Sequence, residues 1–340
     1  MFIFVISCIT VVLFLIIFKH YYLCGGRNTL THSLKGKFII ITGASSGIGK
    51  YSAHHLIENG ATVMFACRNK QRALSAMKGI KHPSQALYTY IDLCDYSSII
   101  AFAKEIKQNH PKIDILMNNA GAHPRDFTLT KDKYESFVQG NYLGMVLLSY
   151  LLLDHMNARS KIINVSSLGH IMNDITKERL KLFEAPQLLE KEYFTSLTRK
   201  LLLYCDTKLF VVQFTRYFAK ECEQHGKQVK MVCLHPGVVD TAFVRFVEDY
   251  KVLALMFKLV TPIWKYLSKT TEQGAQTQLL LSYMPYEDIM NGCYYSDCTV
   301  KKPHDKALDD ELVKYVMNWT IGELKGKVRD EEVMRCINNI

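Results

Sequence analysis

A glycine-rich segment between a short apolar run and a helical stretch most limits the folds open to this 340-residue chain. Phe38 to Ile41 is apolar and β-branched, and Thr42-Gly43-Ala44-Ser45-Ser46-Gly47-Ile48-Gly49 follows it directly. A helical pattern then continues to Asn59. A glycine turn in this position lets the backbone approach a diphosphate and directs helix N–H groups at it. We therefore predict a dinucleotide site formed by Gly43, Ser45, Ser46, Gly47, Ile48 and Gly49.

Five further short apolar runs continue the pattern. They lie at residues 61–66, 86–91, 113–117, 161–165 and 229–234. Amphipathic helical windows separate them, for example 97–108 and 134–156. Short buried strands that alternate with helices predict an α/β fold: a Rossmann-type, doubly wound parallel sheet of about seven strands flanked by helices.

The residues after the second strand indicate which dinucleotide is bound. An NAD site usually has an acid about 20 residues after the glycines, where it accepts from the ribose hydroxyls. This chain has Ala66-Cys67-Arg68-Asn69 there, with no carboxylate. The guanidinium of Arg68 can form a fork with a 2′-phosphate, and Lys50 adds a second positive charge. The cofactor is therefore predicted to be NADP(H).

Polar residues also follow the third and fourth predicted strands. Asp92 suits a contact to the adenine edge of a cofactor, and it equally suits a loop or helix N-cap. Asn118-Asn119-Ala120-Gly121 ends the fourth strand, so Asn119 is expected to face the ligand crevice at the carboxyl ends of the strands.

The first 23 residues differ from the rest of the chain. Residues 2–18 carry no charge, and Tyr21 and Tyr22 lie where an interfacial aromatic belt would fall. Extended to residue 23, the segment reaches spanning length and predicts an N-terminal transmembrane anchor, followed by a linker at 24–36. A secretory signal peptide is the competing interpretation, but there is no charge before Lys19 and no good cleavage site. The cations after the segment place the main domain on the cytoplasmic side: Lys19, Arg27, Lys35 and Lys37.

Charge and cysteine content narrow the partners. Lys plus Arg exceed Asp plus Glu by 42 − 32 = 10, which suits nucleic acid, an anionic membrane or a phosphate-rich cofactor. No compact basic run with interleaved aromatics occurs, so no nucleic-acid partner is expected. The ten cysteines form no Cys-x-x-Cys pair and no zinc-type cluster. We expect no metal site, and free thiols in a reducing compartment.

Together these motifs give the chain a resemblance to the short-chain dehydrogenase/reductases over roughly residues 36–300. The resemblance rests on six motifs in order: Thr42 to Gly49, Asn118 to Gly121, Asn141, Ser166-Ser167, Tyr204-Cys205-Asp206-Thr207-Lys208, and His235-Pro236-Gly237 with Thr241. Within that family the chain is most similar to the membrane-bound retinol dehydrogenases that act as retinal reductases. This resemblance implies a domain over 37–300, followed by a helical tail at 301–340.

The resemblance implies roles for individual residues. Tyr204 would be the acid/base, Ser167 would hydrogen-bond the substrate oxygen, and Asn141 would hold a water that links Lys208 to solvent. Tyr204, Lys208, Pro236 and Thr241 would also contact the cofactor. Tyrosine and lysine four apart share one helix face, and a neighbouring ammonium is expected to lower the pKa of Tyr204 from its free value near 10.

Two features depart from the family pattern. Asp206 lies between Tyr204 and Lys208, where neutral or basic residues are usual, and at i+2 it is expected to face away from the site. The gap between Ser167 and Tyr204 is 204 − 167 = 37 residues, which makes residues 168–203 a long insertion. Its Lys-, Glu- and Leu-rich part, 177–200, is expected to add a helix beside the substrate mouth.

A substrate lid is expected at about residues 241–270. Its apolar and basic part, 250–269, could dip into a bilayer surface or pack on the core of its own domain.

The sequence thus favours an NADP(H)-dependent oxidoreductase that interconverts an apolar alcohol and its carbonyl, with retinol and retinal first. A steroid or lipid-carbonyl reductase, or a cofactor-binding membrane scaffold without catalysis, are the alternatives. Besides the substrate, the expected partner is a lipid membrane; a homodimer stays open. Endoplasmic reticulum is the expected location, with lipid droplet and mitochondrion as alternatives. Glycan on the sequon Asn318-Trp319-Thr320 would contradict the cytoplasmic orientation.

Overall fold

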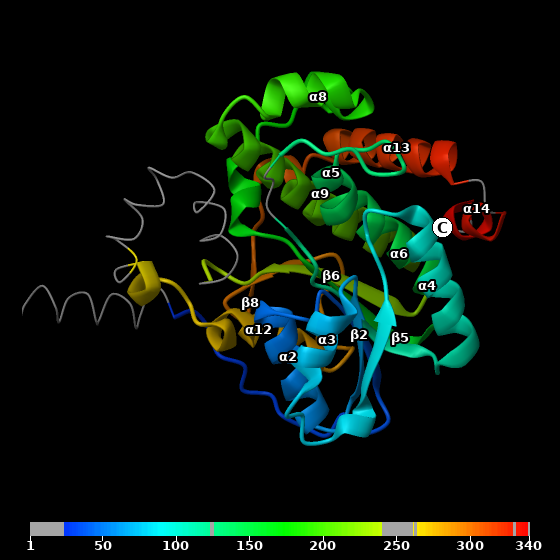
Figure 1. The fold of residues 1–340 in the computed structure, drawn as a ribbon, viewed down its shortest axis with the longest axis vertical. Coiled ribbons are helices and arrows are strands. Elements are labelled where there is room, and N and C mark those ends of the chain that lie inside the picture. The colour runs from blue at the N-terminus through cyan, green and yellow to red at the C-terminus, as the bar shows by residue number, and fades with distance from the viewer. Residues whose placement is uncertain (1–23, 123–125, 240–260, 262–263, 329–330, 339–340) are drawn as a thin grey trace, which may run out of the picture.

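An eight-stranded sheet forms the centre of the computed structural model, which describes residues 24–122, 126–239, 261, 264–328 and 331–338 (Figure 1). Its strand order is β3-β2-β1-β4-β5-β6-β7-β8. The strands are β1 Phe38–Thr42, β2 Thr62–Cys67, β3 Ala86–Tyr90, β4 Ile113–Asn118, β5 Met156–Val165, β6 Val229–His235, β7 Tyr294–Ser296 and β8 Thr299–Lys301. Neighbours from β3 to β7 pair in parallel, and β8 is antiparallel to β7. The predicted doubly wound parallel sheet is confirmed, with this short antiparallel strand in addition.

Helices cover both faces of the sheet (Figure 1). One face carries α2 Gly47–Glu58, α3 Lys70–Met77 and α12 Thr271–Tyr283. The other carries α4 Tyr96–Asn109, α6 Gly144–Leu153 and α9 Leu197–Gln224. On their outer side, α13 Asp310–Lys327 packs against α9, and α14 Glu331–Asn338 packs against α6. Successive side chains of a strand point to opposite faces of the sheet. Ile39 and Ile41 of β1 therefore pack in the core beneath α2, and Phe38 and Ile40 pack in the core beneath α4. This alternation explains why β1 is apolar throughout: both of its faces are buried.

The window 134–156 is not the amphipathic helix that its sequence predicts. It contains α5 Ser136–Val138, a π-helical turn η3 Gln139–Leu143, and α6, and every residue of α6 is buried. The reason is that α6 packs against the sheet, α4 and α14 at once. Within the described residues, one helical segment, Ser136–Leu153, is long and apolar enough to cross a membrane. Most of it is buried inside the fold. We therefore assign it to the core. The predicted anchor at 1–23 lies outside the described residues.

The insertion between Ser167 and Tyr204 forms short helical pieces rather than one helix. They are η4 Leu168–Met172, α7 Lys177–Leu180, η5 Lys181–Glu184 and α8 Pro186–Tyr193, after which α9 begins. Pro186 at the first helical position sets where α8 starts, and the Ser196 side chain caps the start of α9. Two other short 3-10 turns are η2 Pro83–Gln85 and η6 Asp305–Ala307.

The strand order reverses between β1 and β4. Chain segments leave these two neighbouring strands toward opposite faces of the sheet, which opens a crevice at their carboxyl ends. The glycine turn follows β1 and the Asn-Asn-Ala-Gly segment follows β4, so both motifs meet at this point.

Candidate active site

The glycine turn brings the ends of β1 and β4 unusually close. Gly43 and Gly47 have φ values of 70° and 57°, a region that favours glycine. The N–H of Gly43 donates to the carbonyl of Ala66 at 2.9 Å. A Cβ on Gly43 would lie 3.0 Å from the Cα of Ala120. A side chain is thus excluded at Gly43, where the turn packs against the backbone that follows β4.

Asn119 holds the turn in place. Its Nδ2 donates to the carbonyl of Thr42 at 2.9 Å, and the Ala120 N–H donates to the Thr42 hydroxyl at 3.0 Å. The same amide nitrogen lies so close to Gly49 that a Cβ there would overlap it. Asn119 therefore supports the turn at both Thr42 and Gly49, and its contact with a ligand stays a prediction.

The N-terminus of α2 fits the diphosphate of a dinucleotide. Ser46 occupies the N-cap position with extended backbone but makes no side-chain capping hydrogen bond, and the first turn contains no acid. The first N–H groups of α2 therefore have no side-chain cap from Ser46. They lie at the positive end of the helix dipole. Ser45 precedes the N-cap, and Ile48 and Lys50 lie in the first turn of the helix.

The residues predicted to contact the distal part of the cofactor follow β2 and β3. Arg68 is exposed directly after β2, and it lies close enough to Cys94 to act on that thiol electrostatically. The Asp92 carboxylate accepts from the Cys94 N–H at 3.0 Å, and Asp95 caps α4 in its place. Asp92 thus has a loop role, and its adenine contact stays a prediction. Pro236 follows β6; Thr241 lies outside the described residues.

Tyr204 and Lys208 lie one helical turn apart on α9. The Lys208 Nζ is 5.8 Å from the centre of the Tyr204 ring and donates to the carbonyl of Val165 at 3.0 Å. A Cβ on Gly121 would lie 3.1 Å from the same Nζ, so Lys208 reaches the segment after β4. The lysine therefore bridges α9, the end of β5 and the end of β4.

Asn141 joins this group from the π-helical turn η3. Its Oδ1 accepts from the Ala122 N–H at 2.9 Å, and its Nδ2 donates to the Ala122 carbonyl at 3.0 Å. Such π turns are frequent at functional sites because the extra residue redirects a side chain. Asn141 thereby fixes the segment that begins at Gly121.

Ser167 completes the group at the end of β5. Its Oγ accepts from the Gly169 N–H at 3.1 Å, and its side chain is also hydrogen-bonded to Tyr204. A Cβ on Gly169 would lie 3.5 Å from the Tyr204 Cε1, so Gly169 packs against the tyrosine ring. The four side chains expected to act together are therefore neighbours.

Ser166 is a site residue whose role the sequence did not reveal. Its hydroxyl donates to the backbone carbonyl of Lys208 at 2.7 Å and is buried. This hydrogen bond and the one from Lys208 Nζ to the Val165 carbonyl link the end of β5 to α9, with one donor on each element. The motif contains two serines, and nothing in it indicates which faces the helix.

The pKa values contradict one expectation. The expected lowering of the Tyr204 pKa is wrong for this structure, because burial raises it to about 12 and outweighs the opposing hydrogen bond from Ser167. Burial also lowers the pKa of Lys208 to about 8. Tyr204 therefore keeps its proton at neutral pH, which makes it a proton donor.

Asp206 faces away from Lys208, as expected. It is fully buried, and its two carboxylate oxygens accept from the Tyr193 hydroxyl at 2.6 Å and the Asp174 N–H at 2.9 Å. Burial raises the pKa of Asp206 to about 6, against the effect of these hydrogen bonds.

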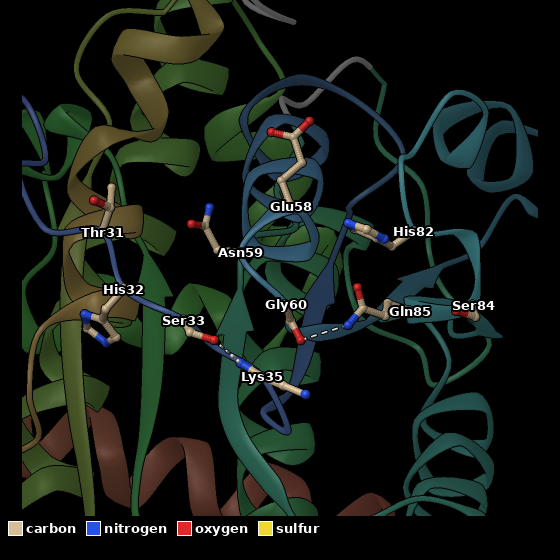
Figure 2. A pocket seen from close by; sticks show the side chains of 10 residues that line it. All are labelled: Thr31, His32, Ser33, Lys35, Glu58, Asn59, Gly60, His82, Ser84 and Gln85. Atoms are coloured by element: carbon tan, nitrogen blue, oxygen red, sulfur yellow. Dashed lines mark hydrogen bonds between the residues drawn. The ribbon is translucent and has the colours of Figure 1, made fainter.

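Two grooves lie away from Tyr204, Lys208 and Ser167. Figure 2 shows the larger, of about 720 Å³, where Glu58, His82 and Gln85 surround the space at the amino ends of β1 to β3. The other, of about 430 Å³, runs along α2 from Gly47 to Glu58. In the described part of the chain, no cluster of three His, Cys, Asp or Glu side chains could hold a metal ion.

Comparisons with known proteins agree with the fold and identify the family. Residues 37–176 match the family model described as short chain dehydrogenase. The chain is 35% identical to human Retinol dehydrogenase 12 over 302 residues, covering 87% of this chain and 89% of that protein. It is 32% identical to mouse Retinol dehydrogenase 14, covering 88% of each. A crystal structure of an uncharacterized protein from Mycobacterium paratuberculosis shares the fold, with a TM-score of 0.68 at 22% identity, over 88% of this chain and 98% of the other.

Proposed function

The chain belongs to the short-chain dehydrogenase/reductase family and to its retinol dehydrogenase-like subgroup, and from this premise we propose that it reduces an apolar aldehyde or ketone with NADPH. Membership makes the protein an oxidoreductase that acts on alcohols and their carbonyl products with a nicotinamide cofactor. The names of its relatives favour retinal as the carbonyl; a steroid or lipid aldehyde is the second candidate. The convergence of Tyr204, Lys208 and Ser167 beside the glycine turn carries the proposal.

The proposed mechanism assigns each side chain one task. When bound, the nicotinamide supplies the hydride in reduction and accepts it in oxidation. Tyr204 donates its proton to the substrate oxygen, and the Ser167 hydroxyl hydrogen-bonds that oxygen and stabilises the charge that develops there. The Lys208 ammonium stabilises the phenolate left on Tyr204. The high pKa of Tyr204 favours the reductive direction, because the phenol is the form present at neutral pH.

Asn141 and Ser166 are assigned positioning tasks. Asn141 holds the backbone of Ala122, and so supports the segment that Lys208 contacts. Ser166 fixes the helix backbone at Lys208 itself. Site residues held in this way lose little freedom when substrate binds, which favours a reactive geometry.

A carbonyl panel tests the proposed function directly. Purified full-length protein in detergent or lipid would be assayed for NADPH oxidation with retinal, a steroid ketone and a long-chain aldehyde, and the Tyr204→Phe variant would give the background rate. Turnover above that background on one of these substrates supports the enzyme. If no substrate exceeds it while NADPH still binds, the membrane scaffold is the better account.

Arg68→Asp is expected to reverse the cofactor preference. The carboxylate would repel a 2′-phosphate and accept from ribose hydroxyls, as an acid does in NAD sites. Charge-assisted hydrogen bonds contribute about 1.5–3 kcal/mol, so kcat/KM with NADPH should fall roughly 10- to 150-fold relative to NADH. Arg72→Asp, on the exposed surface of α3, is the matched control. An unchanged NADPH to NADH ratio in Arg68→Asp would contradict the assignment.

Reduction should slow as pH rises through about 8. Lys208 is protonated below its pKa of about 8 and neutral above it, whereas Tyr204 keeps its proton over the whole range. Loss of the ammonium removes the charge that stabilises the Tyr204 phenolate. The measurement is kcat/KM for the cofactor against pH, which reports the free enzyme. Lys208→Arg keeps its charge, so its profile should lose the alkaline limb; a flat wild-type profile would exclude this role for Lys208.

We place the catalytic domain on the cytoplasmic face of the endoplasmic reticulum membrane, tethered by residues 1–23. The cations that follow this segment, from Lys19 to Lys37, support this orientation. Asn318 lies within helix α13, and Thr320 is fully buried, with its hydroxyl 2.8 Å from the Tyr142 hydroxyl. Acceptor sequons belong to surface loops, so this one is poorly placed for glycosylation in the folded domain. Glycan on Asn318 in cells would contradict the orientation.

A further inference from the structure

The helix that carries the catalytic pair has a second, differently directed polar residue. Asp206 lies two positions after Tyr204 and two before Lys208. At 3.6 residues per turn it is rotated by about 200° from Tyr204, so it projects from the opposite side of α9. Its carboxylate is fully buried there, beneath the insertion.

Two separate parts of the insertion meet at this carboxylate. The Tyr193 hydroxyl, at the end of α8, donates to Oδ2 at 2.6 Å, and the Asp174 N–H, just before α7, donates to Oδ1 at 2.9 Å. Each oxygen thus accepts from a different segment. An ionised carboxylate is the side chain best suited to this position, because it presents two acceptors and no donor.

The Asp174 contact closes a ring that includes the active site. Residues 167–174 are fastened to α9 at both ends: Ser167 is hydrogen-bonded to Tyr204, and Asp174 donates to Asp206. Between them Gly169 packs against Tyr204 and Cys205. Displacement of this segment at its Asp174 end would therefore be transmitted through η4 to Ser167.

Charged groups reinforce the insertion around this joint. Arg179 pairs with Asp174 at 3.2 Å and with Glu192 at 3.1 Å, and its guanidinium lies over the Tyr193 ring at 5.3 Å. The positive charge of Arg179 favours the ionised form of Asp206. Arg199 pairs with Glu192 at 3.0 Å, but it is more exposed and contributes less.

We propose that Asp206 is a positioning residue, which fastens residues 168–193 to the catalytic helix and thereby holds Ser167 against Tyr204. The proposal rests on the proposed function, because Ser167 and Tyr204 are assigned their tasks there. It gives the insertion a role in supporting the catalytic side chains. It also accounts for an acid within a Tyr-x-x-x-Lys motif: the carboxylate serves the insertion and leaves Lys208 unaffected.

Three variants separate positioning from simple stability. Asp206→Ala leaves the Tyr193 hydroxyl and the Asp174 N–H without their acceptor and lets the 167–174 segment shift. Because small displacements of catalytic groups have large effects, we expect kcat to fall at least about tenfold while KM for NADPH stays unchanged. Asp206→Asn keeps an acceptor for Asp174 and can donate to the Tyr193 oxygen, so it should recover most of the rate. Tyr193→Phe removes one donor only, and its loss should be intermediate.

Asn291→Ala is the matched control for stability. The Asn291 Oδ1 accepts from the Met231 N–H at 2.9 Å, near the amino end of β6 and away from the catalytic residues. Asn291→Ala removes the acceptor of the Met231 N–H, just as Asp206→Ala removes the acceptor of the Asp174 N–H. The melting temperature should therefore fall in both variants. Only Asp206→Ala should lose kcat per molecule of bound NADPH. Equal kcat in the two variants would overturn the proposal.

Hydrogen–deuterium exchange makes the result independent of turnover. Amides of residues 168–176 should exchange faster in Asp206→Ala than in wild type or Asn291→Ala, and Asp206→Asn should resemble wild type. Unchanged exchange there would overturn the fastening role even if the enzyme is active. If exchange changes as expected but the wild type turns over no carbonyl, the proposed function fails and the fastening of the insertion stands.

Should Asp206→Ala fail to fold, Tyr193→Phe and Asp206→Asn still decide the question. Wild-type kcat and exchange in Tyr193→Phe would contradict the proposal, and a graded loss of both would support it.

Discussion

Tyr204→Phe is expected to lower kcat for carbonyl reduction by about a hundredfold to ten-thousandfold, the range that a general acid contributes. The phenylalanine ring can keep its packing against Gly169. It lacks the proton that the substrate oxygen must receive, and it also loses the hydrogen bond with Ser167. Substrate-dependent NADPH consumption would measure the effect, and NADPH binding by fluorescence should remain close to wild type.

Tyr150→Phe provides the matched control for this change. Tyr150 lies on α6, is buried, and packs edge-on against Phe218 with ring centres 4.9 Å apart. The same loss of a hydroxyl there should leave kcat unchanged. A Tyr204→Phe variant with wild-type kcat would show that the proton comes from another group, and the proposed mechanism would be wrong.

The shape of the glycine turn could be predicted because its determinants are local. A glycine turn that joins a buried strand to a helix needs no distant residue to define its shape, and the structure places Gly43 and Gly47 at positive φ. The alternation of apolar runs predicted the sheet for the same reason. What the motif could not show is that Asn119 supports the turn through Thr42, because 77 residues separate them.

The burial of individual side chains could not be predicted from local sequence. The spacing of Tyr204 and Lys208 correctly places them on one helix face, but the shift in the Tyr204 pKa depends on how much protein surrounds the phenol. Desolvation is a property of the whole fold and here outweighs local interactions. The all-buried helix α6 shows the same limit, since its sequence does not reveal that elements from three sides enclose it.

The insertion shows what depends on tertiary contacts. Its composition predicted helix, and helix is present, but in pieces fixed by Pro186 and by side-chain caps such as Thr176. The partner of Asp206 could be any buried donor, and only the fold selects Tyr193 and the Asp174 N–H. Helical periodicity did predict that Asp206 faces away from the site, because that follows from α9 alone.

Gly49→Ala is expected to weaken the cofactor site and the fold together. Alanine suits a helix interior better than glycine by up to about 1 kcal/mol, which by itself would stabilise α2. At this position the new Cβ would overlap the Asn119 amide and lie 3.0 Å from the Gly43 carbonyl oxygen. The overlap should dominate and lower the free energy of unfolding by about 1–3 kcal/mol, as overpacking does. Thermal and denaturant unfolding would measure it.

The same overlap should raise KM for NADPH, because Asn119 can yield only by releasing the Thr42 carbonyl that shapes the turn. Loss of one hydrogen bond to a charged diphosphate, at about 1.5–3 kcal/mol, corresponds to roughly a 10- to 150-fold rise. Gly322→Ala is the matched control: Gly322 lies in α13 with nothing within 4 Å of its added Cβ. There the gain in helix propensity is unopposed, so the protein should become slightly more stable with KM unchanged. If both substitutions stabilise the protein and neither alters KM, the contact between Asn119 and Gly49 does not control the turn, and the cofactor must be held chiefly by other groups.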